Sequence, residues 1–274
     1  SEASGIVITA HIHPDGDAAG STNALLCYLR SRGKDNVRIV YPEPLADTIS
    51  FIAEGNDGSF ILDAAVSPEE CRRAVSSADL IFCLDCNSFA RTGPLEDAMR
   101  SSSARKVLID HHLNPTVEAD MKVSFPDLSS TSEIVFRLVW QMGDFERMTK
   151  KFAVPLYCGM MTDTGGFTYN SSSPEIFYAV CQLLTKRFDK DKIYRNVYNN
   201  YSSWAIRLRG HLMSQKLNVF DDLHACYYTL TRQEMRDYHY VRGDGEGLVN
   251  EPLRIKGMKM SISLREDDRI DNKV

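Results

Sequence analysis

The sequence contains no long hydrophobic run, no excess of basic charge and no regular set of cysteines. None of its apolar stretches approaches the roughly 18–20 residues that a membrane span needs, and its first residues lack the pattern of a secretory signal. Lys and Arg number 32 against 37 Asp and Glu, which leaves no bulk electrostatic case for coating duplex nucleic acid. The seven cysteines are scattered and odd in number, which favours reduced thiols. We therefore expect a cytoplasmic protein with neither a membrane nor duplex nucleic acid as a partner.

The remaining composition is that of a folded globular protein. Of the 274 residues, 43% are hydrophobic and 25% are charged, which excludes disordered, collagen-like and coiled-coil chains. This length provides for one large domain or two modest domains of about 100–200 residues each.

Short apolar and β-branched runs alternate with helical patterns in the first part of the chain. We predict strands at residues 6–10, 37–41, 80–84 and 106–109. Helical spacing lies between them, notably at residues 18–29, 68–76 and 95–101. The third and fourth runs are almost continuously apolar, which is typical of parallel strands covered on both faces. The pattern predicts an α/β fold with a doubly wound, mainly parallel sheet.

The later part of the chain is more helical and then turns to a second, smaller α/β pattern. Ser130-x-x-Glu133 has the form of a capping box, and Ser173-Pro174 has the form of a helix start. The polar stretch at 187–200 marks the end of the first domain. We predict a first domain at 1–190, a helical linker at 191–217 and a partial α/β domain at 218–274. Within the last domain we predict strands at 225–230 and 253–264 and a helix at 233–238.

Two patterns favour packing over chemistry. An aromatic series with helical spacing runs through Tyr194, Tyr198, Tyr201 and Trp204. Such a series is more typical of a core between domains than of a base-stacking surface. Cys83 and Cys86 have the spacing of a redox or zinc pair, but no second pair accompanies them, so we interpret them as packed small residues.

Acids and histidines follow three of the predicted strands. The strand at 6–10 is followed by His11, Asp15 and Asp17. The strand at 80–84 is followed by Asp85, and the strand at 106–109 by Asp110, His111 and His112. The carboxyl ends of parallel strands form one crevice, so these side chains should converge. Asp163 adds another acid on a glycine-rich turn.

This set of residues predicts a metal centre. A single Asp after a strand is often only the cap of the next helix. Capping does not require histidines, however. Four of the seven histidines lie beside these acids in two clusters, His11 with His13 and His111 with His112. The gathered carboxylates would repel one another severely unless cations lie between them. Carboxylates mixed with imidazoles suit Mn²⁺ or Mg²⁺, and the number of acids suits two ions that share one carboxylate.

The motifs H-x-x-x-D-x-D, a strand-end Asp, D-H-H and D-T-G-G-F occur in this order between residues 6 and 170. In this the sequence resembles the DHH phosphoesterase superfamily, and most of all its compact subfamily of oligoribonucleases and 3′-phosphoadenosine-5′-phosphate (pAp) phosphatases. The resemblance implies a DHH domain joined to a DHH-associated domain, with two divalent cations, Mn²⁺ in preference to Mg²⁺.

The resemblance also implies roles for individual residues. One ion would be held by His11, Asp15 and Asp85, and the other by Asp17, Asp85, His111 and Asp163. Asp85 would bridge the two ions. His112 would approach the scissile phosphate, and Asp110 would orient the histidines. Arg91 resembles an arginine that touches substrate in relatives, with a surface ion pair as the alternative reading.

The implied activity is hydrolysis of phosphate esters in small nucleotides: short single-stranded oligoribonucleotides, pAp, and linear or cyclic dinucleotides. A homodimer is a further expectation. The alternatives are a single-strand exonuclease of the RecJ type, a pyrophosphatase, and a nucleotide sensor without turnover. The glycine-histidine loop of the family's C-terminal domain does not occur before Val274, so we expect the functional protein to be longer.

Overall fold

The computed structural model describes residues 3–54, 60–241, 243–245 and 247–266. The chain divides into two compact units, Ser1–Val197 and Tyr198–Val274. Among the described residues, no helix has the length and apolar character needed to cross a membrane.

The first unit is built on a six-stranded sheet in which every neighbouring pair is parallel, in the order β3-β2-β1-β4-β5-β6. The strands are β1 (Ile6–Thr9), β2 (Val37–Tyr41), β3 (Ile61–Asp63), β4 (Leu80–Leu84), β5 (Arg105–Asp110) and β6 (Met121–Ser124). The chain winds outward from β1 to β3 and then crosses back to β4, so the strand order reverses between β1 and β4. This confirms the predicted doubly wound α/β fold, although the short edge strands β3 and β6 were not predicted.

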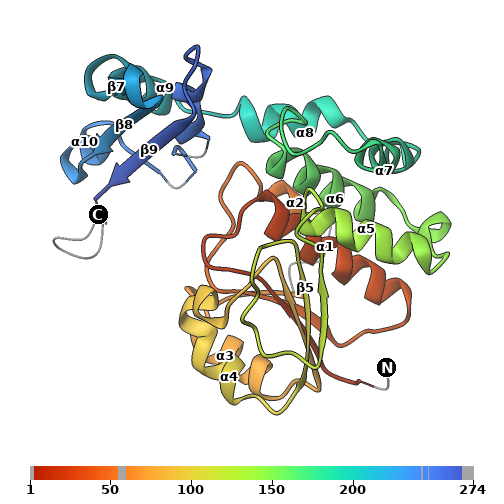
Figure 1. Cartoon of the computed structure of the whole chain (residues 1–274). Helices are drawn as coiled ribbons and strands as arrows, with labels where there is room; N and C mark the ends of the chain where they lie inside the picture. Colours follow the sequence, from red (N-terminus) through yellow and green to blue (C-terminus); the bar gives the residue numbers. More distant parts are fainter. Residues whose placement is uncertain (1–2, 55–59, 242, 246, 267–274) are drawn as a thin grey trace. The chain divides into compact units, whose positions relative to one another are not determined.

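Helices cover both faces of this sheet. The helices and turns between residues 16 and 198 are α1 (Gly16–Ser31), α2 (Phe51–Glu54), α3 (Pro68–Ser76), the 3₁₀ turn η2 (Phe89–Leu95), α4 (Glu96–Ser101), α5 (Thr131–Gln141), the 3₁₀ turn η3 (Phe145–Arg147), α6 (Lys150–Asp163), α7 (Pro174–Leu184) and α8 (Lys190–Tyr198). Helices α3 and α4 lie on one side of the sheet, with α1, α5 and α6 on the other (Figure 1). Cys71 and Met99 of the first pair pack with Val7, Ile81 and Leu108 of the strands in one buried core.

Both predicted helix starts are present, and one differs in detail. Ser173 accepts a hydrogen bond from the Glu175 amide, and Pro174 is the first residue of α7, as predicted. Ser130 accepts from the Glu133 amide, but the Glu133 side chain accepts from Ser129 instead of closing the predicted box.

Helices α1 and α6 approach closely at glycines. A Cβ on Gly20 would collide with the Pro155 carbonyl, and one on Gly159 would lie 2.8 Å from Asp17 Oδ1 and collide with Ser132 Oγ. The absence of side chains at Gly20 and Gly159 therefore lets α1, α6 and the start of α5 converge around Asp17.

The second unit has a three-stranded sheet in the order β7-β8-β9, with β7 and β8 antiparallel and β8 and β9 parallel. Its elements are α9 (Ser203–His211), the π-helical turn η4 (Leu212–Lys216), β7 (Asn218–Phe220), the 3₁₀ turn η5 (Asp221–Leu223), β8 (Ala225–Leu230), α10 (Arg232–Asp237), the 3₁₀ turn η6 (Leu248–Arg254) and β9 (Met260–Arg265). Its core includes Leu208 and Leu212, which pack with Tyr228 and Leu230 of β8. The strand predicted at 253–264 begins only at Met260, because residues 253–254 belong to η6 and the chain turns at 255–257, where Gly257 has φ 85°.

Two packing predictions had different outcomes. Cys83 and Cys86 are buried free thiols, which agrees with the interpretation as packed small residues. The aromatic series does not form one buried face: α8 ends at Tyr198 and α9 begins at Ser203, and Trp204 is 41% exposed. The prediction that this series is core is therefore wrong for Trp204 and for Tyr194, which is 47% exposed.

Candidate metal centre

His11 and Asp15 lie just beyond β1. His11 Nδ1 lies 2.7 Å from the Ile12 carbonyl, which can only accept, so Nδ1 carries a hydrogen and Nε2 is the atom available to a metal. Nε2 lies 3.6 Å from Asp15 Oδ2 and 3.4 Å from Asp85 Oδ2. The other oxygen of Asp15 accepts from the Asp17 and Ala18 amides and caps α1. Asp15 is thus both the cap of a helix and a carboxylate that faces His11.

Asp17, His111 and Asp163 form a second group. The fully buried Asp17 accepts hydrogen bonds from the amides of Thr131 (2.6 Å) and Ser132 (2.8 Å), in the first turn of α5. His111 Nε2 lies 3.0 Å from Asp163 Oδ2, at the end of α6, and 3.9 Å from Asp17 Oδ2. Two helix ends and β5 therefore bring these three side chains together.

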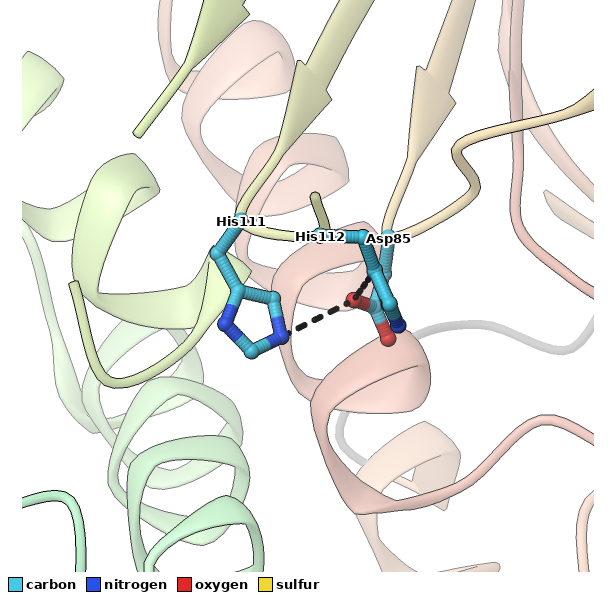
Figure 2. Close-up of side chains that lie close together, drawn as sticks. All are labelled: Asp85, His111 and His112. Atoms are coloured by element: carbon cyan, nitrogen blue, oxygen red, sulfur yellow. Dashed lines mark ion pairs between the residues drawn. The ribbon is translucent and has the colours of Figure 1, made fainter. Parts of the chain in front are cut away.

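Asp85 lies between the two groups. One of its oxygens is 3.4 Å from His11 Nε2 and the other is 3.6 Å from His111 Nε2. Figure 2 shows its carboxylate between His111 and His112. Its backbone has φ 53°, in the left-handed region that Asp and Asn enter more readily than other side chains. The hydroxyl of Thr131 donates to it over 3.1 Å, which fixes the orientation of the carboxylate.

His112 is held between Asp110 and Arg91. Its Nε2 lies 3.1 Å from Arg91 Nη1 and its Nδ1 lies 2.7 Å from Asp110 Oδ1. Because arginine only donates, Nε2 accepts and Nδ1 donates to Asp110. The His112 side chain is 30% exposed, against 2% for Asp85, so His112 can meet a bound substrate.

Burial and mutual repulsion disfavour the charged forms of two acids. Burial raises the pKa of Asp17 well above its usual range, and the neighbouring charges of Asp85 and Asp163 raise it further. Burial also raises the pKa of Asp163 to about 6, against the opposing effect of His111. A cation at this position would relieve the repulsion.

The two histidines respond in the opposite direction. Burial alone would lower the pKa of His11 and that of His111. The adjacent carboxylates outweigh burial and raise both pKa values to about 10. For His11 these carboxylates are Asp15 and Asp85, and for His111 the main one is Asp163. In the absence of metal, protons on these rings therefore balance part of the negative charge.

The residues present fit divalent cations. Three groups have ligand atoms within 4.8 Å of one another: His11, Asp15 and Asp85; Asp17, His111 and Asp163; and Asp85, His111 and His112. Within the described part of the chain, His11 Nε2 is buried without a hydrogen-bond partner. Carboxylate oxygens and imidazole nitrogens together suit Mn²⁺, and Mg²⁺ when oxygen ligands predominate.

The structure adds contacts that the sequence reasoning missed. Thr131 and Ser132 hold two of the acids, and the Leu128 carbonyl lies 3.4 Å from His111 Nδ1. The polar run 129–132 before an apolar helical pattern was the available signal. His13, which the sequence places beside His11, instead pairs with Glu43 at 2.7 Å.

Substitution of Gly159 by Ala should damage both the fold and the centre. The new Cβ would press on Ser132 and Asp17, and overpacking of this kind costs about 1–3 kcal/mol of unfolding free energy. Urea unfolding and Mn²⁺ titration of the full chain measure the two effects. Gly5→Ala is the matched control, because its Cβ would meet its nearest neighbour at 3.6 Å, an ordinary contact. Wild-type stability and metal affinity in Gly159→Ala would contradict this description of the helix crossing.

Comparison with known proteins agrees with this geometry. Residues 5–160 match the model of the DHH family, N-terminal domain. Over 269 residues the chain is 22% identical to the bifunctional oligoribonuclease and PAP phosphatase NrnA of Bacillus subtilis, covering 97% of this chain and 79% of that protein. The chain is also 26% identical over 188 residues to an uncharacterized protein of Mycoplasma pneumoniae. The match covers 69% of this chain and 53% of that protein, so the chain spans about half of that relative's length.

A solved structure is also similar. The crystal structure of an exopolyphosphatase-related protein from Bacteroides fragilis superimposes with a TM-score of 0.90 at 42% identity, over 97% of this chain and 77% of that one. The family match covers more than half of the residues and contains every proposed metal ligand except Asp163. The motif order, the doubly wound sheet and the acids at its carboxyl edge thus have one explanation: the chain belongs to the DHH family.

Proposed function

We propose that this chain is a metal-dependent phosphoesterase that hydrolyses phosphate esters in small nucleotides, with short oligoribonucleotides and pAp as its substrates. The observation that carries the proposal is the convergence of three donor groups, linked through Asp85 and His111, at the carboxyl edge of one sheet. The name of the Bacillus subtilis relative supports the substrate class.

We assign one cation to His11, Asp15 and Asp85, and a second to Asp17, Asp85, His111 and Asp163, with Mn²⁺ as the preferred metal. When bound, such a pair supplies an activated water and neutralises charge on the phosphoryl oxygens.

The protein's own contribution is orientation. The first-turn amides of α5 hold Asp17 and the Thr131 hydroxyl holds Asp85, so neither carboxylate has to reorganise when a cation binds. Asp110 fixes the His112 ring through Nδ1, and Nε2 accepts from Arg91; only a protonated ring would donate Nε2–H to a substrate oxygen. The Arg91 guanidinium offers several donors in one plane, which matches phosphate geometry.

A substrate panel tests the proposal. We expect the full chain with Mn²⁺ to release mononucleotide from a diribonucleotide and inorganic phosphate from pAp. A cyclic dinucleotide, inorganic pyrophosphate and a long single-stranded DNA complete the panel and separate the alternatives. Binding of every nucleotide without product release would favour a sensor and overturn the proposed activity.

Metal affinity should rise with pH. At neutral pH the metal-free centre carries protons on His11 and His111, whose pKa values are raised to about 10, and each must leave when its ring binds a cation. Burial raises the pKa of Asp163 to about 6, so below this pH a proton on Asp163 also competes with the cation. We therefore expect Mn²⁺ affinity to increase about tenfold per pH unit for each proton displaced between pH 6 and 8.5.

Calorimetry in buffers of different ionisation enthalpy counts the protons released. Mn²⁺ binding of constant affinity over this pH range, with no proton release, would contradict the assignment of both histidines as ligands.

A further inference from the structure

The second unit contains a groove whose lining residues all lie outside the metal centre. It measures about 750 Å³ and is lined by residues of α9, the π-helical turn η4, α10 and the residue that follows α10. The groove is open to solvent, and its volume lies within the range of about 300–1,000 Å³ found for small-molecule sites. Turns of the π type also occur often at functional sites.

Flat aromatic surfaces line the groove. Trp204 is 41% exposed, and the Arg207 guanidinium lies 5.7 Å from the centre of its ring. His211 and Tyr238 stack with their ring centres 5.3 Å apart and their planes at 27°. Arg207 lies over the indole and the His239 ring meets it edge-on, with ring centres 4.6 Å apart, so a flat heterocycle can stack only on the part of the indole that stays exposed.

Polar groups of both kinds stand beside these rings. Ser214 and Gln215, both exposed on the π-helical turn, provide hydrogen-bond donors and acceptors, and Asp237 provides a carboxylate. The Glu234 carboxylate is matched by His211 at 2.9 Å and Lys216 at 3.0 Å. Its negative charge is therefore compensated, and the Asp237 carboxylate accepts a hydrogen bond from Gln233 Nε2 at 2.6 Å.

From this combination we propose that the groove binds a nucleobase, carried by a nucleoside or mononucleotide. The base stacks on the aromatic surface and its polar edge meets Ser214, Gln215 and Asp237, with Arg207 on the side of the phosphate. A purely apolar ligand would leave these polar groups desolvated without partners, and a polyanion would meet the carboxylates. None of the residues that line the groove belongs to the metal centre.

Trp204 itself reports the binding. The chain has two tryptophans, and the other, Trp140, packs on Phe136 and Phe145 in the first unit. In the full-length Trp140→Phe variant, with EDTA present, AMP should quench the remaining fluorescence saturably and adenosine should do the same. Ribose 5-phosphate, which lacks the base, should not.

Two substitutions test the location. Gln215→Ala and Tyr238→Ala should each weaken AMP binding about tenfold, within the range of single base contacts. Phe220→Ala, which removes a 45%-exposed ring on β7 that does not line the groove, should change nothing. Gln215 is exposed on the turn, so its replacement keeps the test valid if Tyr238→Ala fails to fold.

The same titration separates this site from the hydrolytic centre. Asp85→Asn in the same background should abolish hydrolysis and leave quenching unchanged. Absence of saturation up to about 10 mM AMP, equal quenching by ribose 5-phosphate, or wild-type affinity in both groove variants would overturn the proposal.

Discussion

Replacement of Asp85 by Asn should reduce hydrolysis of every nucleotide substrate by about a thousandfold or more, because one buried carboxylate is proposed to serve both cations. Asn is the informative replacement, since it tolerates the left-handed backbone at φ 53° and still accepts the Thr131 hydroxyl. The measurements are kcat/KM on pAp and on a diribonucleotide, with the metal content of the same preparation.

Asp97→Asn is the matched control, since it removes an exposed acid from α4 and should leave activity unchanged. The two substitutions should differ in their effect on activity because Asp85 is buried among the proposed metal ligands and Asp97 is on the surface. The Asp85 side chain is 2% exposed, and its two oxygens face different histidines at 3.4 and 3.6 Å. A variant that kept a tenth of the wild-type rate would show that Asp85 does not bridge.

Replacement of His112 by Ala should lower kcat about a hundredfold while Mn²⁺ affinity stays near the wild-type value. The ring is proposed to contact the phosphate through Nε2 and to be oriented by Asp110 through Nδ1. Asp110→Asn should therefore cost less, and the double variant should be no slower than His112→Ala alone.

Metal titration and single-turnover kinetics of the three variants test this second prediction. Parallel loss of Mn²⁺ and activity in His112→Ala would instead make His112 a metal ligand, in the group that it forms with Asp85 and His111.

The sequence predicted the parts of the fold that hydrophobic periodicity determines. Strands β1, β2 and β4 bury almost all of their side chains and β5 buries its last three, so the positions and parallel direction of these strands could be inferred. Strands β3 and β6 contain no fully buried residue, and their three and four residues mix apolar with polar side chains, so neither shows an apolar run. The convergence of the acids and histidines that follow β1, β4 and β5 could also be inferred, because these parallel strands have their carboxyl ends at one edge of the sheet.

Other features depend on contacts that residue types specify only weakly. The amides that hold Asp17 belong to the backbone, and any residue except proline at 131 and 132 would supply them. One oxygen of Glu133 accepts from Ser129 and the other pairs with Arg137 one helical turn away, so the capping box stays incomplete despite its spacing. For Trp204, helical spacing indicates a shared face but does not say whether another element covers it.

The central claim is that two cations held by these side chains carry out the hydrolysis. Its most direct measurement is metal content and activity in one chelator-stripped preparation of the full chain, titrated with Mn²⁺. We predict no release of phosphate from pAp in EDTA, and activity that reaches its maximum as a second equivalent of Mn²⁺ binds. Full activity in chelator, or a maximum at one equivalent with no second ion bound, would contradict the account.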